Sequence, residues 1–384
     1  MRTLFMSLGG LAVLLAGFAP AAFAGGTVEF GEHQSITVGA GMRSAFTIVE
    51  DSAPSGSDSS TDIDLQSVRV YVNGQIHKNV KFTFNTECES CVFGQDADDI
   101  GVLDAILQLE LNDAFNIWIG RMLTPADRIE LNGPYYALSW NQYTVPLLPS
   151  DQLGAAGLLG RDEGVTVWGS IGKLQYAAGI FDGLEGGANQ KDKLLFAGRV
   201  AYNFLEMEKN PGYYTSSTYY GNGGDVFTLG VSFQSQSDGT GTVQEPGDFQ
   251  AVIVDALFEK VLGDAGVLTL EGEYKMFDAD LTATALADPT CFCLFDGDAF
   301  FVTGAYMFPQ EVGPGKLQPY VRFTSNEPDF PGMEDSDLTE VGVNYIIKGH
   351  NLRFNLNYTS GDANLTGSPG ADLDGVSFGV QIQI

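Results

Sequence analysis

The C-terminal stretch Val376-Ser377-Phe378-Gly379-Val380-Gln381-Ile382-Gln383-Ile384 decides the fold. Its apolar side chains alternate with small or polar ones without a break, up to the last residue. A period of two predicts a β-strand with one apolar face and one polar face. The same alternation recurs along the chain in stretches of about ten residues, which is the pattern of a transmembrane β-barrel.

The N-terminus has the features of a cleaved signal peptide over residues 1–24. Arg2 is followed by an apolar stretch over residues 8–18 and by Ala22-Phe23-Ala24, so we expect the mature chain to begin near Gly25. No later stretch approaches the ~18 consecutive apolar residues of a transmembrane helix. An exported chain of this kind stays in the periplasm, is secreted, or crosses a membrane as strands. The recurring alternation favours strands, and therefore the outer membrane of a Gram-negative bacterium.

The part of the chain after residue 24 divides into about sixteen alternating stretches. The clearest hairpin joins Val341–Ile347 to Leu352–Tyr358 through Gly349-His350. No linker interrupts the series, so we predict one domain over residues 25–384, an all-β antiparallel barrel. An even number of strands places both termini on the periplasmic side.

Barrels of this class have short periplasmic turns and long outer loops. We expect short turns at Asn73-Gly74, Asn112-Asp113, Gly172-Lys173, Gly263-Asp264 and Gly349-His350. The longer, outer connections are predicted at 49–63, 86–100, 123–162, 183–192, 238–248, 278–298, 325–337 and 361–373. The connection 205–224 is long although it falls on the short side. Either a strand is miscounted there, or this turn is elaborated.

The composition limits the classes of function. The chain has 49 Asp and Glu against 19 Lys and Arg, a net charge of -30, which argues against nucleic acid as a partner. There are only 3 His, and the sequence has no G-x-S-x-G, no H-E-x-x-H and no phosphate-binding glycine loop. We therefore expect neither catalysis nor a cofactor.

The cysteines occur as two close pairs, Cys88 with Cys91 and Cys291 with Cys293. Cysteines of exported proteins usually form disulfides, and four of them allow three pairings that the sequence leaves open. Four thiolates could also hold zinc or an iron–sulfur cluster. The C-x-C spacing is unusual for such a site and supporting histidines are lacking, so we predict disulfides and no metal.

Several short segments resemble one known family, the phosphate-selective porin O/P family. They are Arg69-Val70-Tyr71-Val72-Asn73-Gly74 with Asn79-Val80-Lys81-Phe82, Ile119-Gly120-Arg121-Met122-Leu123-Thr124-Pro125, Gly160-Arg161-Asp162-Glu163-Gly164-Val165, Gly179-Ile180-Phe181-Asp182-Gly183 and Gly342-Val343-Asn344-Tyr345. The resemblance implies a sixteen-stranded, trimeric channel whose loop after the fifth strand folds into the pore. That loop would be 123–162 here, a candidate constriction.

The alternation also predicts which side chains face the lumen. Opposite the apolar residues stand both basic and acidic ones, so the predicted wall is mixed, whereas anion-selective members of the resembled family concentrate Lys and Arg there. Such a charge often only keeps the wall wet and pairs with a neighbour. Our candidates for lining the pore are Arg43, Arg69, Lys81, Arg128, Arg161, Asp162, Arg199, Glu271, Glu273, Arg322 and Arg353.

These features predict a porin for passive diffusion of small hydrophilic or ionic solutes. The acidic composition favours a cation-preferring or weakly selective pore, because charged rings set ion selectivity. One alternative is a pore for phosphate or another oxyanion, as in the resembled family. The other is a barrel that acts as a scaffold or sheath for a periplasmic or surface partner such as a cytochrome, bound through 205–224. The expected partners are outer-membrane lipid, small ionic solutes and, from the resemblance alone, two further copies of the chain.

Overall fold

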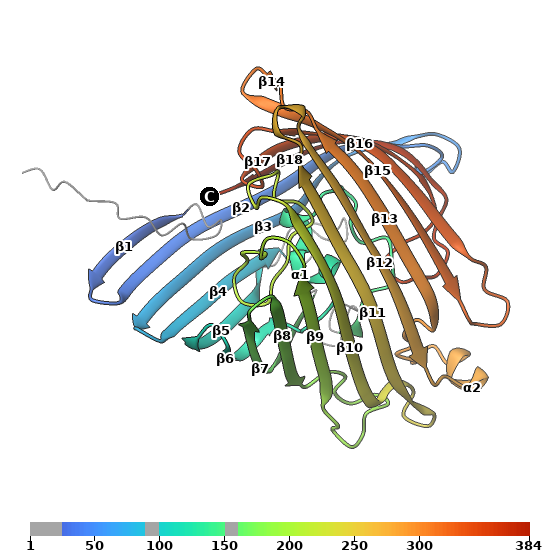
Figure 1. The fold of residues 1–384 in the computed structure, drawn as a ribbon. Coiled ribbons are helices and arrows are strands. Elements are labelled where there is room, and N and C mark those ends of the chain that lie inside the picture. The colour runs from blue at the N-terminus through green and yellow to red at the C-terminus, as the bar shows by residue number, and fades with distance from the viewer. Residues whose placement is uncertain (1–24, 89–99, 150–159) are drawn as a thin grey trace, which may run out of the picture.

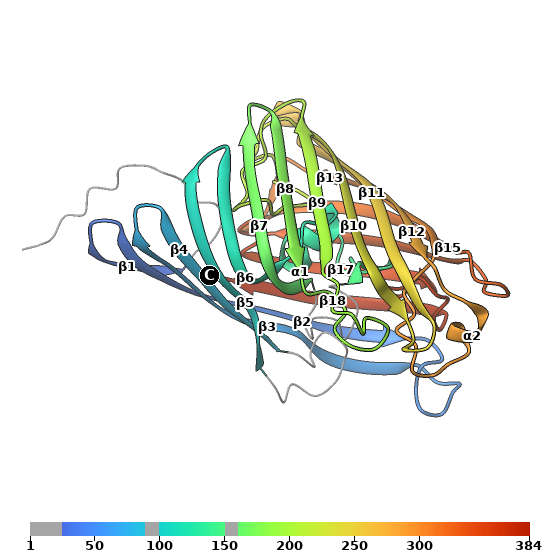
Figure 2. The same cartoon turned by 90° about the horizontal axis from the view of Figure 1, so that it is seen from below.

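The computed structural model describes residues 25–88, 100–149 and 160–384. The predicted signal peptide and Cys91 lie outside these ranges. Sixteen antiparallel strands form a closed barrel, in which the last strand pairs with the first (Figure 1, Figure 2). This confirms the predicted fold. Among the described residues, no helix is long and apolar enough to span a membrane.

The barrel strands follow one another in chain order around the ring. They are β2 (Gln34–Val49), β3 (Ser60–His77), β4 (Val80–Cys88), β5 (Ile100–Asn112), β6 (Phe115–Leu123), β7 (Arg161–Ile171), β8 (Leu174–Phe181), β9 (Leu195–Asn203), β10 (Val226–Gly241), β11 (Pro246–Val261), β12 (Val267–Ala279), β13 (Gly297–Met307), β15 (Gly315–Pro328), β16 (Ser336–Ile346), β17 (Leu352–Gly361) and β18 (Leu373–Gln383).

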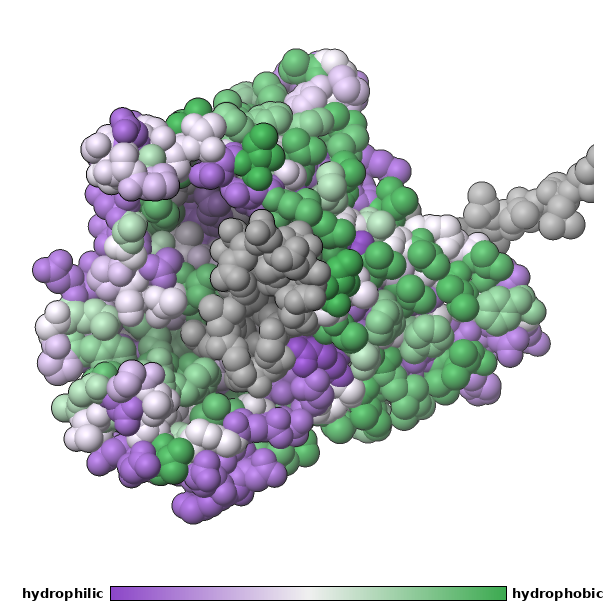
Figure 3. Space-filling model, turned by 180° about the vertical axis from the view of Figure 1, so that it is seen from behind, coloured by the Kyte–Doolittle hydropathy of each residue, from purple (hydrophilic) through white to green (hydrophobic). Residues whose placement is uncertain are grey.

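The burial pattern is inverted relative to a water-soluble barrel. In β18, Val376 and Phe378 are exposed, whereas Ser377 and Gln381 are buried. Hydrophobic residues spread over the outer wall, as Figure 3 shows for one side. The outward apolar side chains contact lipid hydrocarbon. They would therefore gain nothing from facing inward. The alternation of β18 therefore faces the way the sequence predicts.

Two short strands lie outside the ring. β1 (Gly26–Gly31) pairs with the first half of β2, beyond the point where β18 ends, and extends the sheet past the barrel rim (Figure 1). β14 (Glu311–Val312) forms a small hairpin with β15. Neither strand was predicted, because segments this short carry too few alternations to be recognised.

The predicted turn at Asn73-Gly74 is wrong. β3 continues through both residues to His77, and the chain turns at 78–79 instead. Gln75 and His77 pair with Lys81 and Val80, so the backbone gains ladder hydrogen bonds by staying extended. An Asn-Gly pair favours a hairpin turn, but it does not form one where the residues that follow continue to pair with the neighbouring strand.

Apart from the boundary at 73–74, most of the predicted short and long connections hold. The outer connection predicted at 238–248 is an exception, because β10 continues to Gly241 and β11 begins at Pro246, which leaves a short turn at 242–245. We call the rim at the C-terminal end of β18 the terminal rim, which the sequence predicts to be periplasmic. It carries the connections 78–79, 113–114, 172–173, 204–225, 262–266, 308–314 and 347–351. The helical segment η3 (Gly263–Ala265) lies in one of them, and α2 (Ala283–Leu286) lies in a connection of the opposite rim.

Two connections fold into the barrel. Residues 124–149, which we call the inserted loop, enter from the opposite rim and contain α1 (Arg128–Tyr136), which is kinked at Gly133 before Pro134. In both ribbon views α1 lies within the ring of strands (Figure 1, Figure 2). Residues 204–225, which we call the inner turn, enter from the terminal rim. Their buried residues include Tyr213 and Thr218.

Candidate functional site

A buried ionic cluster joins the inserted loop, the inner turn and the wall. Arg128 of α1 donates from Nη1 to Glu208 Oε2 at 2.8 Å and from Nη2 to Glu208 Oε1 at 2.7 Å. Its Nε lies 3.3 Å from Asp255 Oδ1 on β11, and Arg199 of β9 donates to the same carboxylate from Nη2 at 2.8 Å. Burial acts to raise the pKa of Glu208, but the Arg128 guanidinium outweighs it and lowers that pKa. The two arginines and two carboxylates thus balance each other.

Lys275 of β12 forms a second buried cluster with the inserted loop. Its Nζ lies 2.7 Å from Asp127 Oδ2 and 2.9 Å from Glu130 Oε1, and it donates to the carbonyl of Pro146 at 3.0 Å. Asp127 also caps α1 by accepting from the Glu130 amide at 3.0 Å. Burial and the Glu130 carboxylate raise the pKa of Asp127 to about 7, against the opposing effect of Lys275. The start of the inserted loop is therefore anchored by charge.

The arginines of the β15–β2 side of the wall bind the backbone of the same loop. Each is buried and donates to a carbonyl oxygen, so the guanidinium groups replace the water that loop carbonyls would otherwise need. The bonds run from Arg322 Nη2 to Gln142 O at 2.9 Å, from Arg353 Nη1 to Ala137 O at 2.6 Å and from Arg43 Nη2 to Trp140 O at 3.1 Å.

Trp140 packs the middle of the inserted loop against the barrel wall. The guanidinium carbon of Arg43 lies 4.1 Å from the Trp140 ring centroid, within cation–π range. Glu340 accepts from the Trp140 amide at 3.0 Å. The ring packs over Gly379 of β18, where a Cβ atom would overlap it. A residue without a side chain is therefore required at this point of β18.

We predict that Gly379→Ala lowers the free energy of unfolding by about 1–3 kcal/mol, because the added methyl group must displace Trp140 or the strand. Urea unfolding in lipid vesicles, followed by tryptophan fluorescence, measures the change. Gly304→Ala is the matched control, since a Cβ there meets Leu270 Cδ2 at an ordinary 3.5 Å. Equal stability of the two variants would contradict the close packing of Trp140 against Gly379.

The inner turn is attached to the wall through carboxylates of β11 and β12. Glu259 accepts from Thr218 Oγ1 at 2.7 Å, from the Tyr219 amide at 3.0 Å and from the Gly221 amide at 2.8 Å. Ser217 Oγ donates to Glu271 Oε1 at 2.6 Å. Each of these donors belongs to the turn, so the wall acids fix its backbone as well as its side chains.

His350 of the terminal rim packs where the inner turn meets the inserted loop. Its Nε2 donates to the Thr218 carbonyl at 2.9 Å, and its ring centroid lies 5.0 Å from that of Tyr136 and 4.8 Å from that of Tyr220. Burial, together with the charge of Arg353, lowers the pKa of His350 to about 3. The ring is therefore neutral at physiological pH.

An aromatic cluster fills the other side of the inner turn. Trp118 of β6 contacts Tyr213, Tyr214 and Trp168, with ring centroids 5.3–5.6 Å apart. Tyr213 also donates to the carbonyl of Leu123 at the base of the inserted loop. The interior is thus partly apolar, whereas the sequence predicted a lumen wall of basic and acidic residues.

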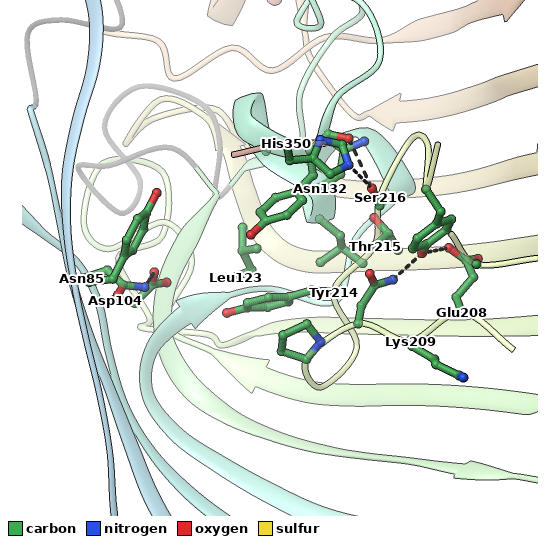
Figure 4. Close-up of a pocket in the computed structure, with 18 of the residues that line it drawn as sticks. Asn85, Asp104, Leu123, Asn132, Glu208, Lys209, Tyr214, Thr215, Ser216 and His350 are labelled. Atoms are coloured by element: carbon green, nitrogen blue, oxygen red, sulfur yellow. Dashed lines mark hydrogen bonds between the residues drawn. The ribbon is translucent and has the colours of Figure 1, made fainter. Parts of the chain in front are cut away.

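A cavity of about 400 Å³ remains between the inserted loop, the inner turn and the β3–β7 part of the wall (Figure 4). Figure 4 shows Asn85 and Asp104 on the wall across from Tyr214, Thr215 and Glu208 of the turn. A second cavity, of about 640 Å³, lies nearer the terminal rim and is lined by wall residues such as Glu110, Asp113 and Asn116. Both of these cavities therefore lie on the β3–β8 side of the barrel.

Of the predicted pore-lining residues, Arg69 and Arg161 line the 400 Å³ cavity. Arg69 pairs with Glu87 at 2.5 Å, and Arg161 pairs with Asp104 at 3.0 Å. Both cations therefore have a carboxylate partner on the wall, which reduces the field that each projects into the cavity.

The other predicted lining residues serve mainly as attachments. Arg43, Arg128, Arg199, Arg322 and Arg353 hold the two inserted segments, as described above. Glu271 binds the inner turn, and Glu273 Oε2 accepts from the amide of Ile129 at 2.9 Å. Asp162 accepts from the Gly183 and Glu163 amides, both at 2.8 Å. Lys81 pairs with Glu110 while staying half-exposed.

Among the described residues, the cysteines and the acidic groups show no arrangement that requires a metal. Cys291 and Cys293 form a disulfide, Cys88 is disulfide-bonded as well, and Cys91 lies outside the described residues. Asp162, Glu163 and Asp182 bring carboxylate oxygens within 4.8 Å of one another. Asp162 already accepts backbone bonds, and Glu163 pairs with Arg121 at 2.7 Å. We therefore assign no metal to this group.

The sequence did not predict the role of the inner turn. Its length on the short-turn side was visible, but nothing in the pattern showed that Glu208 or Tyr213 would enter the lumen. The inward position of Trp118 could have been found, because it alternates with Ile117 and Ile119. A large aromatic on the lumen face indicates a packed interior rather than open water.

Comparison with known proteins places the chain in a family. A family model described as Gram-negative porin matches residues 10–383. Similar solved structures, each sharing the fold at low identity, are OmpT of Vibrio cholerae (14% identity, 93% of this chain and 100% of that chain, TM-score 0.56), an anion-selective porin from Comamonas acidovorans (14%, 91% and 100%, TM-score 0.61) and Salmonella typhi OmpF in complex with daunomycin (11%, 92% and 98%, TM-score 0.56).

No curated protein matches this chain. The family match covers nearly the whole sequence, and the closed ring of strands agrees with it. The chain therefore belongs to the Gram-negative porins and forms a sixteen-stranded β-barrel in the outer membrane.

Proposed function

We propose that this porin lets small hydrophilic or ionic solutes diffuse passively along the β3–β7 wall, with weak selectivity or a preference for cations. The pairing of charges at the cavity carries the proposal. Arg69 and Arg161 face Glu87 and Asp104, and Glu208 is matched by Arg128. Balanced charges give a weak local field, and the overall charge of -30 tilts the preference toward cations.

Selectivity for phosphate or another oxyanion is the second candidate. Two arginines line the cavity, and the sequence resembles the phosphate-selective porin O/P family. The similar Comamonas structure is also described as anion-selective. Pairing with carboxylates weakens this candidate, because a paired guanidinium attracts a passing anion less than a free one does.

The scaffold hypothesis loses its proposed docking element. It placed a partner such as a cytochrome on the tyrosine-rich connection 205–224, yet Tyr213 and Tyr220 of that segment are buried inside the barrel.

We also propose a homotrimer, as the resemblance implies. One of the similar structures is described as the trimer form of Vibrio cholerae OmpT.

Conductance across planar bilayers tests the proposed function. We expect stepwise openings from refolded residues 25–384, with a small reversal potential of cation sign across a salt gradient. A large reversal potential of anion sign would instead support the oxyanion candidate. Folded protein, shown by heat-modifiable migration in gels, that never opens would contradict a diffusion pore of either kind.

A further inference from the structure

We propose that the inner turn is a second constriction element of this pore, and that Lys209 on it contributes to ion selectivity. The proposal rests on the diffusion function proposed above and adds which residues set the width and charge of the path. The inserted loop narrows the barrel from one rim, and the inner turn narrows it from the other. Solutes then pass between the turn and the β3–β7 wall.

The inner turn occupies lumen space rather than covering the rim. Tyr213, Ser216, Ser217 and Thr218 are all buried, and Tyr213 packs on Trp118 of the wall. Thr215 Oγ1 donates to the Arg128 carbonyl of the inserted loop at 2.8 Å. A segment that only closed a hairpin would leave these polar side chains in solvent. The turn therefore takes up part of the interior cross-section.

The attachment of the turn is fixed at several points. Glu208 binds Arg128 through two hydrogen bonds, and the hydroxyl of Tyr219 donates to the same carboxylate at 2.6 Å. Glu259 holds the far end of the turn through the contacts described above. Charge-assisted bonds of this kind are stronger than neutral ones, and together they favour a rigid element over a loosely hinged plug.

The same turn borders both cavities. Met207, Glu208 and Asn210 line the 400 Å³ cavity and also the 640 Å³ cavity. The opposite side of the first is formed by β3–β7, and that of the second by the terminal ends of β5–β8. A solute that crosses the described interior through these cavities must therefore pass the inner turn.

Lys209 carries an unpaired charge on the side of the 400 Å³ cavity that the inner turn forms. It is exposed, lines the 400 Å³ cavity and forms no ion pair with any described residue. Arg69, Arg161 and Glu208 each have a partner of opposite charge. In a narrow path an unpaired charge acts on a passing ion more strongly than a neutralised pair does. Lys209 should therefore favour anions locally and oppose the cation preference of the acidic chain.

Two variants test the proposal in planar bilayers. In the first, Asn-Gly replaces residues 207–223, joining Glu206 to Gly224, which lie beside each other. We expect its single-channel conductance to rise about twofold or more, because the barrel wall alone would hold a much wider opening. In the second, Lys209→Glu, we expect the cation-to-anion permeability ratio to rise about twofold.

Matched changes at the same rim serve as controls. Shortening the exposed turn 309–314 should leave conductance unchanged, and Lys78→Glu should leave the permeability ratio unchanged, since neither site lines the cavities. Heat-modifiable migration verifies folding. If the shortened protein does not fold, Lys209→Glu alone decides the proposal.

The outcomes separate this proposal from the diffusion function. Unchanged conductance and selectivity in both variants, with openings in the wild type, would overturn the second constriction and leave the porin intact. Openings only in the shortened protein would support the inner turn as a barrier and overturn diffusion through the wild type. Absence of openings in every folded protein would overturn both.

Discussion

Replacing Asp255 with asparagine should lower the free energy of unfolding by about 3–5 kcal/mol. The carboxylate is fully buried and is shared by Arg128 and Arg199, whose side chains are also buried. Asparagine keeps the size of the side chain but removes the charge and turns donor hydrogens toward two guanidinium groups. One carboxylate, that of Glu208, then remains for both cations. Urea unfolding in lipid vesicles at neutral pH measures the difference.

A surface acid provides the control for this substitution. Asp238 lies 3.0 Å from Lys193 and 3.5 Å from the exposed Lys191. Asp238→Asn should cost less than about 1 kcal/mol, because both lysine partners extend into solvent, which screens their interaction with Asp238. If Asp255→Asn were no more destabilising than Asp238→Asn, the shared carboxylate could not be what holds the inserted loop and inner turn together.

Lys275→Met should have a comparable effect, a loss of about 3–5 kcal/mol, and should also release the start of the inserted loop. Methionine fills the space but leaves Asp127 and Glu130 buried without their cation. Repulsion between the two carboxylates then favours exposure of the loop. Urea unfolding measures the stability, and the variance of the open-channel current reports loop motion. Lys81→Met is the control, since its pair with Glu110 is half-exposed.

The loss in Lys275→Met should grow as the pH rises. Burial and Glu130 raise the pKa of Asp127 from 3.8 to about 7 in the folded protein, so the folded state binds this proton more tightly than the unfolded state does. The stability that the proton on Asp127 contributes to the folded state therefore falls as the pH rises from about 4 to about 7. Removing Lys275 raises this pKa further and increases the cost of ionisation. An equal loss of stability at pH 5 and pH 8 would contradict the ionic anchor.

The sequence predicted the barrel because its main signal is local. Alternation in β18, and in the hairpin that surrounds Gly349-His350, can be read from adjacent residues without knowing what the strands pair with. The count of sixteen strands and the membrane location followed from repetition of that signal. The turn at Asn73-Gly74 was misplaced because a turn signal competes with the register of the neighbouring strand, and the register depends on pairing.

The interior was decided by contacts that the sequence does not reveal. Arg128, Glu208 and Asp255 come from three distant segments, and only the closed ring brings them within hydrogen-bond distance. Alternation predicts Arg322 and Arg353 on the lumen face, but the same parity fits a side chain that lines water and one that binds a loop carbonyl, as both do. The sequence by itself therefore determined the barrel and its lipid-facing surface, since strand periodicity depends on neighbouring residues. The tertiary structure decided which lumen space stays open, because that depends on which segments fold inward to satisfy the buried charges.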